Sequence, residues 1–309
     1  MTDDDRQLRD WLGRGRHFLI TAESDDYPEL LRELGDNPAA LYVDGDRDVL
    51  QLPAIAIVGS RNPTRGGTSN AYEFARHLAR SGFVIVSGLA QGIDTAAHQG
   101  ALDVGGRTIA VLGHGMDSVY PASNRELAGR IAASGALVTE FPLGTPPRRE
   151  NFPARNRIIS GLSLGTLVVE AARRSGSLIT ARLAGEQGRE VFALPGSIHN
   201  PLAKGCHQLI RQGAKLVESV DDILSELRPL ATHLMQNQAD DAASSERPAR
   251  DQQYQLLLDA LAYDPASAEE LASRSGLTIG QVSSMLLILE LEGEVESLPG
   301  GRFSLVSTK

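Results

Sequence analysis

The sequence predicts an α/β fold, a Rossmann-like, doubly wound, mostly parallel sheet followed by a small C-terminal winged-helix domain. Between residues 54 and 224, short apolar runs alternate with helical patterns, which is typical of βαβ units. The first run, 54–58, is apolar throughout, as in a strand that is buried on both faces. After residue 250, three helical patterns precede a pair of strand-like segments, the order of a winged helix-turn-helix.

The expected elements follow from the same patterns taken in chain order. Trp11 and Leu12 lie in a helical start, Pro28 suits the first position of a short helix, and residues 41–43 suit an edge strand. The seven runs expected as strands of the main sheet are 55–58, 84–86, 108–112, 136–138, 166–169, 190–194 and 215–217. Helices are expected at 69–81, 251–263, 268–275 and 278–291, with the final strand pair around 299–301.

These elements predict four parts of the chain. Residues 1–50 form an N-terminal lead-in. Residues 51–228 form the Rossmann-like domain, 229–250 a polar linker rich in alanine and serine, and 251–309 the winged-helix domain.

The composition favours an intracellular protein. No apolar run reaches the roughly 18 residues that a membrane span needs. The acidic start, MTDDDR, lacks the basic and apolar regions of a signal peptide, and the single cysteine, Cys206, allows no internal disulfide. We therefore expect a cytoplasmic protein without membrane association.

Charge is segregated along the chain. The formal net charge is −9, but residues 53–228 carry 19 basic and 14 acidic side chains, whereas residues 251–309 carry 3 and 9. A polyanion would therefore be attracted to the predicted Rossmann-like domain rather than to either end.

The loop after the first strand is suited to an anion. Gly59, Ser60 and Arg61 combine a flexible backbone position, a hydroxyl and a planar guanidinium. Ligands of such sheets gather at the carboxyl ends of the strands, where this loop lies. The alternative is an ordinary strand-to-helix turn with a solvated arginine.

Common cofactor and metal signatures are missing. The sequence has no GxxxxGK[ST] motif and no GxGxxG after the first strand, so neither a P-loop NTPase nor a dinucleotide dehydrogenase is expected. His199, Cys206 and His207 fit no zinc spacing. No serine–histidine–aspartate or paired-carboxylate constellation stands out. We predict no cofactor, no metal and no catalytic residue.

A second informative stretch lies at residues 143–161. Four arginines surround one aromatic ring: Arg148, Arg149, Arg155 and Arg157 flank Phe152. Guanidinium groups neutralise a nucleic-acid backbone, and an aromatic ring offers a base a face for stacking, so this pattern favours single-stranded nucleic acid. Alternatively, Phe152 is a core anchor and the arginines are solvated. The basic domain and the Gly59 loop favour the first interpretation.

The predicted winged helix is poorly suited to duplex DNA. In its third helix, 278–291, only Gln281 belongs to the residue types that read bases in the major groove. Because this part of the chain is also acidic, we favour protein contact or dimerisation for it. A transcription regulator that uses this module to bind duplex DNA remains an alternative.

Four motifs together resemble the DNA-processing protein A (DprA/Smf) family. They are IVGSRNPT at 57–64, SGLAQGIDTAAHQGAL at 87–102, FPARNRIISGLS at 152–163, and SGSLITARLA at 175–184 with ALPGS at 193–197. The chain departs from the family at Gly205-Cys206-His207, where many members have Gly-Thr-Asn. Many members also carry a longer N-terminal SAM-like helical domain, of which the resemblance implies at most a vestige in residues 1–50.

The resemblance implies a non-enzymatic, usually dimeric protein. It would bind single-stranded DNA taken up in natural transformation, protect it and help to load the recombinase RecA for homologous recombination. The implied DNA-binding residues are Gly59, Ser60, Arg61, Arg149, Phe152, Arg155 and Asn156, with Arg148 as a possible substitute for Arg149.

A rival from another class is a nucleotide phosphoribohydrolase of the lysine-decarboxylase-like group, whose Rossmann fold is related. Gly165-Thr166 and Glu170 resemble that group's GT..E pattern, but the glycines that normally precede it are replaced here by Gly161-Leu162-Ser163. Release of free base from a nucleoside monophosphate would favour this rival.

Overall fold

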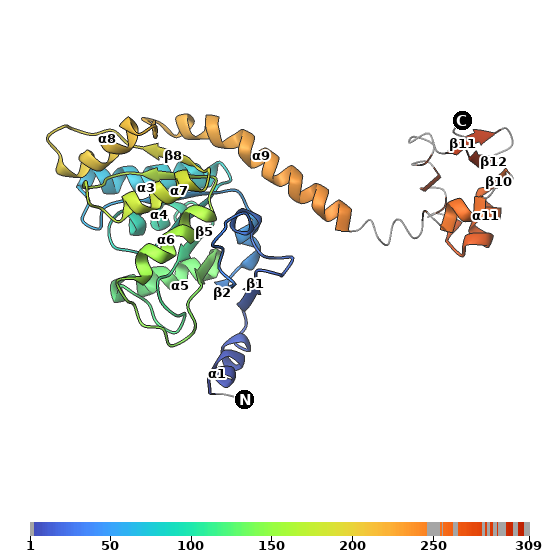
Figure 1. Ribbon diagram of the computed structural model, residues 1–309, viewed down its shortest axis with the longest axis horizontal. Helices are drawn as coiled ribbons and strands as arrows, with labels where there is room; N and C mark the ends of the chain where they lie inside the picture. Colours follow the sequence, from blue (N-terminus) through green and yellow to red (C-terminus); the bar gives the residue numbers. More distant parts are fainter. Residues whose placement is uncertain are drawn as a thin grey trace. The chain divides into compact units, whose positions relative to one another are not determined.

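The computed structural model divides into two units, residues 1–235 and 236–309, which we describe separately (Figure 1). The structure describes residues 3–245, 254, 256–261, 265–279, 282, 285, 286, 289, 295–298 and 302–305.

The first unit is built on a nine-stranded sheet within the described residues, with the order β1-β2-β6-β5-β4-β3-β7-β8-β9. Its strands are β1 (His17–Thr21), β2 (Ala40–Gly45), β3 (Ala54–Val58), β4 (Val84–Ser87), β5 (Thr108–Val111), β6 (Ala136–Thr139), β7 (Gly165–Val168), β8 (Glu190–Ala193) and β9 (Lys215–Leu216). All pairs from β3 to β9 are parallel, whereas β1 and β2 are antiparallel to their neighbours. The seven predicted strands and the mostly parallel sheet are confirmed.

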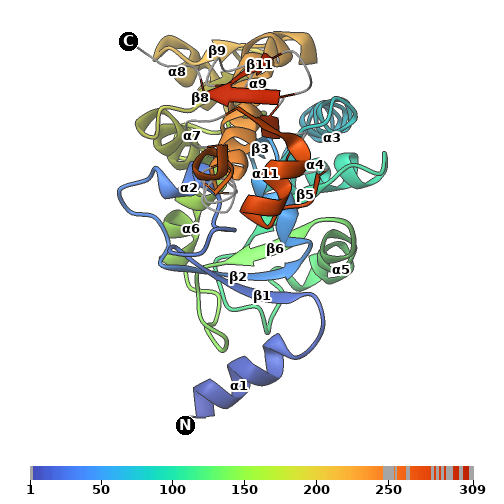
Figure 2. The same ribbon diagram turned by 90° about the vertical axis from the view of Figure 1, so that its right-hand side faces the viewer.

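Helices cover both faces of this sheet. The longer ones are α3 (Arg65–Arg80), α4 (Ile93–Leu102), α5 (Arg125–Ser134), α6 (Asn151–Gly161), α7 (Ser177–Glu186), α8 (Lys204–Arg211) and α9 (Val220–Ser245). Figure 2 shows α6 and α7 on one side of the strands and α3 and α5 on the other. The doubly wound arrangement is therefore confirmed.

The central strand β3 shows how the sequence specifies this sandwich. Its five residues are all buried. Ala54, Ala56 and Val58 join the core under α6 and α7, whereas Ile55 and Ile57 pack in the core under α3 and α4. Because alternate side chains of a strand point to opposite faces, only a continuously apolar run can serve two cores.

The N-terminal lead-in differs from its prediction. The segment is not separate from the Rossmann-like domain, because β1 and β2 extend the same sheet beside β6. The predicted edge strand at 41–43 lies within β2, which is an interior strand with β1 and β6 as neighbours; β1 is the edge. Between these strands lies α2 (Glu29–Arg32), preceded by Pro28 as its N-cap, and a 3-10 turn (Arg47–Gln51) leads to β3. The helix α1 (Asp3–Leu12) precedes β1, and Trp11 stacks on His17 at a centroid distance of 4.3 Å.

The predicted linker segment, 229–250, contains the division between the two units, and its described part is helical. Helix α9 continues through most of residues 229–250 and ends at Ser245. Alanine has the highest helix propensity, so a polar, alanine-rich sequence is compatible with a helix. Pro229 lies inside α9, and the backbone hydrogen bond that its missing N–H removes does not end the helix there.

The second unit contains a three-stranded antiparallel sheet among its described residues, of order β10-β12-β11. The strands are β10 (Ala266–Ser267), β11 (Val295–Leu298) and β12 (Arg302–Leu305). Helix α11 (Ala268–Ser275) begins at a capping box formed by Ser267 and Glu270. The second helix and the strand pair are as predicted, whereas Gln281 lies outside the described residues.

Candidate nucleic-acid interface

The candidate site lies where the strand order of the sheet reverses. From β3 the chain continues through β4, β5 and β6 to one side, whereas β7, β8 and β9 lie on the other side. Ligands of open α/β sheets bind in the crevice at such a switch point, beyond the carboxyl ends of the strands. The loops after β3, β4 and β7 meet here, and a pocket of about 620 Å³ opens beside them.

Gly59 follows β3 directly and is required by close packing. A Cβ added to it would lie 2.7 Å from Ile93 Cγ1 and 2.9 Å from the carbonyl oxygen of Glu170. The missing side chain therefore makes room for the protein's own α4 and β7 segments, although Gly59 also lines the pocket. Ser60 supports the turn itself, because its Oγ accepts a hydrogen bond from the backbone N–H of Asn62 at 3.1 Å.

Glu170 anchors the same loop from the end of β7. One carboxylate oxygen accepts from the backbone N–H of Thr64 at 2.9 Å and the other from the Thr64 hydroxyl at 2.7 Å. Thr64 is the N-cap of α3 and accepts from the N–H of Gly67. Glu170 is the glutamate of the GT..E pattern on which the phosphoribohydrolase alternative depends. In this structure both of its carboxylate oxygens accept hydrogen bonds that hold the start of α3.

Replacing Glu170 with alanine is expected to loosen this loop and lower the free energy of unfolding by roughly 1–3 kcal/mol, because Thr64 loses two part-buried hydrogen bonds to a charged acceptor. Urea unfolding and amide hydrogen exchange at Thr64 measure the two effects. The matched control is Glu186→Ala, which removes an exposed pairing with Arg182 and should change stability by less than about 0.5 kcal/mol. Equal effects of the two variants would refute the anchoring role.

Arg61 and Phe152 form the exposed, cationic and aromatic part of the site. The guanidinium carbon of Arg61 lies 5.6 Å from the ring centroid of Phe152, within the range of a cation–π contact. Arg61 is exposed and has no carboxylate partner among the described residues. Phe152 is half-buried near the start of α6. A cation that lies over an available ring can neutralise a phosphate while a base stacks nearby.

Tyr120 adds an aromatic group that the sequence did not reveal. Its ring centroid lies 5.8 Å from that of Phe152, and the side chain is 48% exposed. A small hollow of about 120 Å³ is lined by both rings together with Arg61 and Gly88. The two aromatic residues are 32 positions apart in the sequence, so only the fold brings them together.

Arg155, in contrast, is buried and supports the site from below. One terminal nitrogen donates to the carbonyl oxygen of Gly88 at 2.8 Å and to that of Val111. A Cβ at Gly88 would approach this guanidinium to 2.5 Å, so the glycine makes room for it. Burial lowers the pKa of Arg155 to about 10, partly offset by the charge of Asp94. Arg155 therefore keeps its positive charge at neutral pH and contributes it from beneath the pocket floor.

Asp94 organises the loop after β4, which was not predicted. Its carboxylate accepts from the backbone N–H groups of Gly88 and Ala90, at 3.1 and 3.3 Å. Between them, Leu89 adopts a left-handed φ of 57°, a conformation that non-glycine residues rarely adopt, and Asn124 donates to its carbonyl oxygen at 2.9 Å. Burial raises the pKa of Asp94, and the charge of Arg155 opposes that rise. Two side chains thus hold a strained loop beside the pocket.

The structure brings most of the predicted residues together. Gly59, Arg61, Arg149, Phe152, Arg155 and Asn156 line the pocket of about 620 Å³. Ser60 and the exposed Arg148 are not among its lining residues. Lining residues that the sequence did not single out for this site include Asp94, Tyr120 and Gly176. Asn156 reaches across to the carbonyl oxygen of Gly176 at 3.5 Å, joining α6 to the start of α7.

The histidines and the cysteine near α8 do not gather as metal ligands. Within the described residues, no group of three metal-binding side chains is present. Cys206 is buried, and burial raises the pKa of its thiol to about 11. His207 is within 3.0 Å of the Gly196 carbonyl oxygen. Among the described helices, none is long and apolar enough to span a bilayer.

A doubly wound α/β fold with a cationic, aromatic pocket at its switch point defines an anion-binding protein suited to nucleotides or nucleic-acid strands. Comparison with known proteins identifies the group: the chain belongs to the DNA recombination-mediator protein A family, whose model matches residues 18–228. A second model, the DprA winged helix domain, matches residues 241–301 and confirms the predicted C-terminal domain. The resemblance to the DprA/Smf family is thereby confirmed.

Individual relatives agree with this assignment. Protein Smf of Escherichia coli (strain K12) is 46% identical over 297 residues, which cover 94% of this chain and 78% of that protein. DNA processing protein DprA of Streptococcus pneumoniae is 49% identical over 202 residues, covering 65% of this chain and 71% of the relative.

Two solved structures are similar in fold as well as sequence. The X-ray structure of DprA from Streptococcus pneumoniae has a TM-score of 0.68 at 45% identity, covering 73% of this chain and 78% of that one. A structure of DNA processing protein A from Helicobacter pylori, described for its single-stranded DNA binding mode, has a TM-score of 0.62 at 32% identity and covers 68% of this chain and 96% of that one.

Proposed function

We propose that this protein binds single-stranded DNA taken up in natural transformation, protects it, and helps to load the recombinase RecA for homologous recombination, in the cytoplasm and without catalysing a reaction. The observation that carries the DNA-binding part is the grouping of Arg61, Phe152 and Arg155 in one pocket at the switch point. The relative from Helicobacter pylori, described as binding single-stranded DNA, supports the choice of ligand.

The chemistry of the pocket favours a single strand over a duplex. Bases of a duplex are stacked on one another and do not present a free face, whereas an unpaired base can stack on Phe152 or Tyr120. Arg61 and Arg149 lie beside these rings and can neutralise flanking phosphates. Such contacts do not read base edges, so binding should be tolerant of sequence and sensitive to salt.

Replacing Arg61 with alanine is expected to weaken binding of an oligothymidine and to reduce the slope of log affinity against log salt by roughly 0.7, the value for one phosphate contact on a single strand. Fluorescence anisotropy at several salt concentrations measures both quantities, with a duplex of equal length for comparison. The control Arg80→Ala removes an exposed arginine that does not line this pocket and should leave the slope unchanged. Equal affinity of the protein for both DNA forms, or an unchanged slope in Arg61→Ala, would overturn the proposal.

We further propose that the protein acts as a homodimer. The sheet ends at β9, a short strand whose Lys215 and Leu216 are exposed. An edge strand with an exposed leucine is a ready surface for pairing with another chain. Sedimentation of the protein and of Leu216→Arg, which places a charge on that edge, measures the association; a dimer unaffected by this change would place the interface elsewhere.

RecA is proposed as a partner because the chain belongs to the recombination-mediator family. Addition of the protein should speed the assembly of RecA on single-stranded DNA, and an unchanged assembly rate would contradict RecA as a partner.

For the acidic winged helix we propose protein contact or dimerisation, since 9 acidic and 3 basic residues between 251 and 309 disfavour a nucleic-acid backbone. Duplex binding by the full chain that is lost on deleting residues 251–309 would contradict that role.

A further inference from the structure

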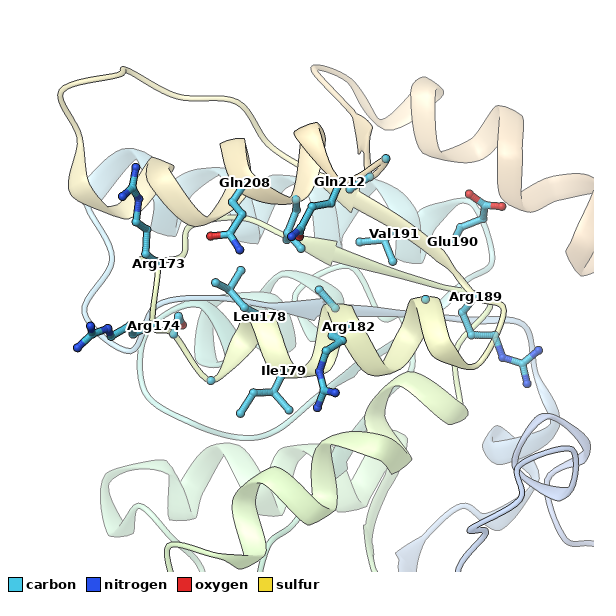
Figure 3. A pocket seen from close by; sticks show the side chains of 17 residues that line it. Arg173, Arg174, Leu178, Ile179, Arg182, Arg189, Glu190, Val191, Gln208 and Gln212 are labelled. Carbon is cyan, nitrogen blue, oxygen red and sulfur yellow. The ribbon is translucent and has the colours of Figure 1, made fainter.

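A second pocket lies next to the candidate site, between α7 and α8 (Figure 3). It has a volume of about 880 Å³, larger than the pocket around Phe152. The two pockets share three lining residues, Ser175, Gly176 and Ile179. The two pockets therefore adjoin at the start of α7.

The charges in the second pocket are arranged unevenly. Figure 3 shows Arg173 and Arg174 on the segment that leads into α7, at the end of the pocket opposite Arg189. Both are exposed, and neither has a hydrogen-bond or ion-pair partner in the described part of the chain. Glu190 is the single acidic side chain among the described lining residues. The free positive charge thus lies at the end that joins the Phe152 pocket.

The other two arginines of this pocket are already engaged. Arg182 pairs with Glu186 at 3.1 Å, and Arg189 pairs with Glu33 and donates to the carbonyl oxygen of Leu30, both at 2.8 Å. The nearby carboxylate partly offsets the positive charge that each of these arginines presents to a ligand. This contrast singles out Arg173 and Arg174 as the cations available for a phosphate.

The residues that line both pockets, Ser175, Gly176 and Ile179, include no acidic side chain. Ser175 and Ser177 lie 2.6 Å apart through their hydroxyl oxygens, where the chain enters α7. The first turn of α7 contains no acidic residue. Beyond it, Leu178 and the amide of Gln208 face each other across the groove (Figure 3). Hydroxyl groups suit a passing phosphate, and an apolar side chain beside an amide suits a base.

We propose that the strand held at Phe152 continues over Ser175 and Gly176 into the α7–α8 groove, where Arg173 and Arg174 bind the phosphates of the next nucleotides. This inference rests on the proposed function and extends the DNA-binding surface to a second subsite. The ligand of this subsite is the same DNA strand, recognised through its phosphates. The subsite therefore contributes only when the strand is long enough to occupy both pockets.

Oligonucleotide length separates the two subsites experimentally. We expect the double variant Arg173→Ala/Arg174→Ala to bind an oligothymidine of about 4 nucleotides as the unmodified protein does, but to bind one of about 16 less tightly. Each single-strand phosphate contact contributes roughly 0.7 to the slope of log affinity against log salt, so the two arginines together contribute roughly 1.4. At about 0.1 M salt, tenfold below 1 M, this slope corresponds to a loss of affinity of roughly 25-fold. The control Arg80→Ala/Arg211→Ala removes the same charge from exposed positions that line neither pocket.

The outcomes distinguish this inference from the proposed function. If the double variant binds the long oligonucleotide as the control does, the second subsite is refuted, whereas the effect of Arg61→Ala on both lengths still supports the Phe152 site. An equal loss for both lengths would place Arg173 and Arg174 in the first subsite and would also refute the extension. A change in self-association with unchanged DNA affinity would assign the groove to protein contact instead. If Arg61→Ala alters the affinity for neither the short nor the long oligonucleotide, the proposed function itself fails.

Discussion

Replacing Arg155 with alanine is expected to lower the free energy of unfolding by about 3–5 kcal/mol, the usual cost of leaving a buried opposite charge without its partner. The guanidinium is buried, donates to the carbonyl oxygens of two strand ends, and opposes the charge of Asp94. Without it, the two carbonyl oxygens lose their donor, and the buried carboxylate keeps the two backbone N–H donors of Gly88 and Ala90 but no opposing charge from Arg155. Urea unfolding followed by circular dichroism measures the loss.

Two further variants test the cause of this loss. Arg130→Ala breaks an exposed ion pair in which Arg130 Nη2 lies 2.9 Å from Asp103 Oδ1. This variant is expected to lower the free energy of unfolding by less than about 1 kcal/mol. Adding Asp94→Asn to Arg155→Ala removes the uncompensated charge but keeps an acceptor for Gly88, so part of the stability should return. If the double variant is no more stable than Arg155→Ala, the charge of Asp94 is not the reason for the loss.

The loss in free energy of unfolding caused by Arg155→Ala, here called the deficit, should also depend on pH. Burial raises the pKa of Asp94 above its usual 3.8. Removing Arg155 removes a charge that opposes this rise. An acid with a raised pKa in the folded state favours folding when it is protonated, and this contribution is lost as pH increases through the folded-state pKa. The deficit of Arg155→Ala is therefore expected to shrink as pH falls from neutral toward 3.8. A deficit that is constant over this range would contradict the role of Asp94.

The sequence predicted the central sheet well because each buried parallel strand is a short, continuously apolar run. The N-terminal strands were harder to place. The burial of β2 alternates along its length, a pattern that is equally compatible with an edge or an interior strand, and its neighbours β1 and β6 are far apart in sequence. From Pro229 onward, α9 is polar and rich in alanine and serine, a composition that favours a linker, whereas most of its apolar stripe lies before this point, at Val220, Ile223, Leu224 and Leu227.

Within the site, the sequence predicted residue types better than their environments. Arg155 was expected to face DNA, but it lies on the same helical stripe as Asn151, Ile158 and Ile159, all buried. Residues spaced three and four apart lie on one face of a helix, so the spacing of Arg155 from Ile158 and Ile159 is the sequence signal that indicates its burial. Asp94 and Tyr120 carry no such local signal, because their roles depend on contacts with loops and rings distant in sequence.

Replacing Phe152 with alanine is expected to weaken binding of an oligothymidine by roughly 5- to 150-fold, since stacking of one base on an aromatic ring contributes about 1–3 kcal/mol. The ring is half-buried, and Arg61 and Tyr120 lie beside it at 5.6 and 5.8 Å. Fluorescence anisotropy measures the affinity, and thermal unfolding establishes that the variant is folded. Phe152→Trp keeps an aromatic face and serves as the matched variant, with most of the affinity retained.

The contribution of Arg61 can be separated from that of the ring by combining Phe152→Ala with Arg61→Ala. If the guanidinium acts partly through its position over the ring, the two losses will not add, and the coupling should be about 0.5–2 kcal/mol. Strictly additive losses would mean that Arg61 and Phe152 contact the strand independently, as a phosphate ligand and a stacking face. An affinity of Phe152→Ala equal to that of the unmodified protein would remove the ring from the interface, and would restore the view of Phe152 as a core anchor beside Gly113, where a Cβ would approach its ring to 3.0 Å.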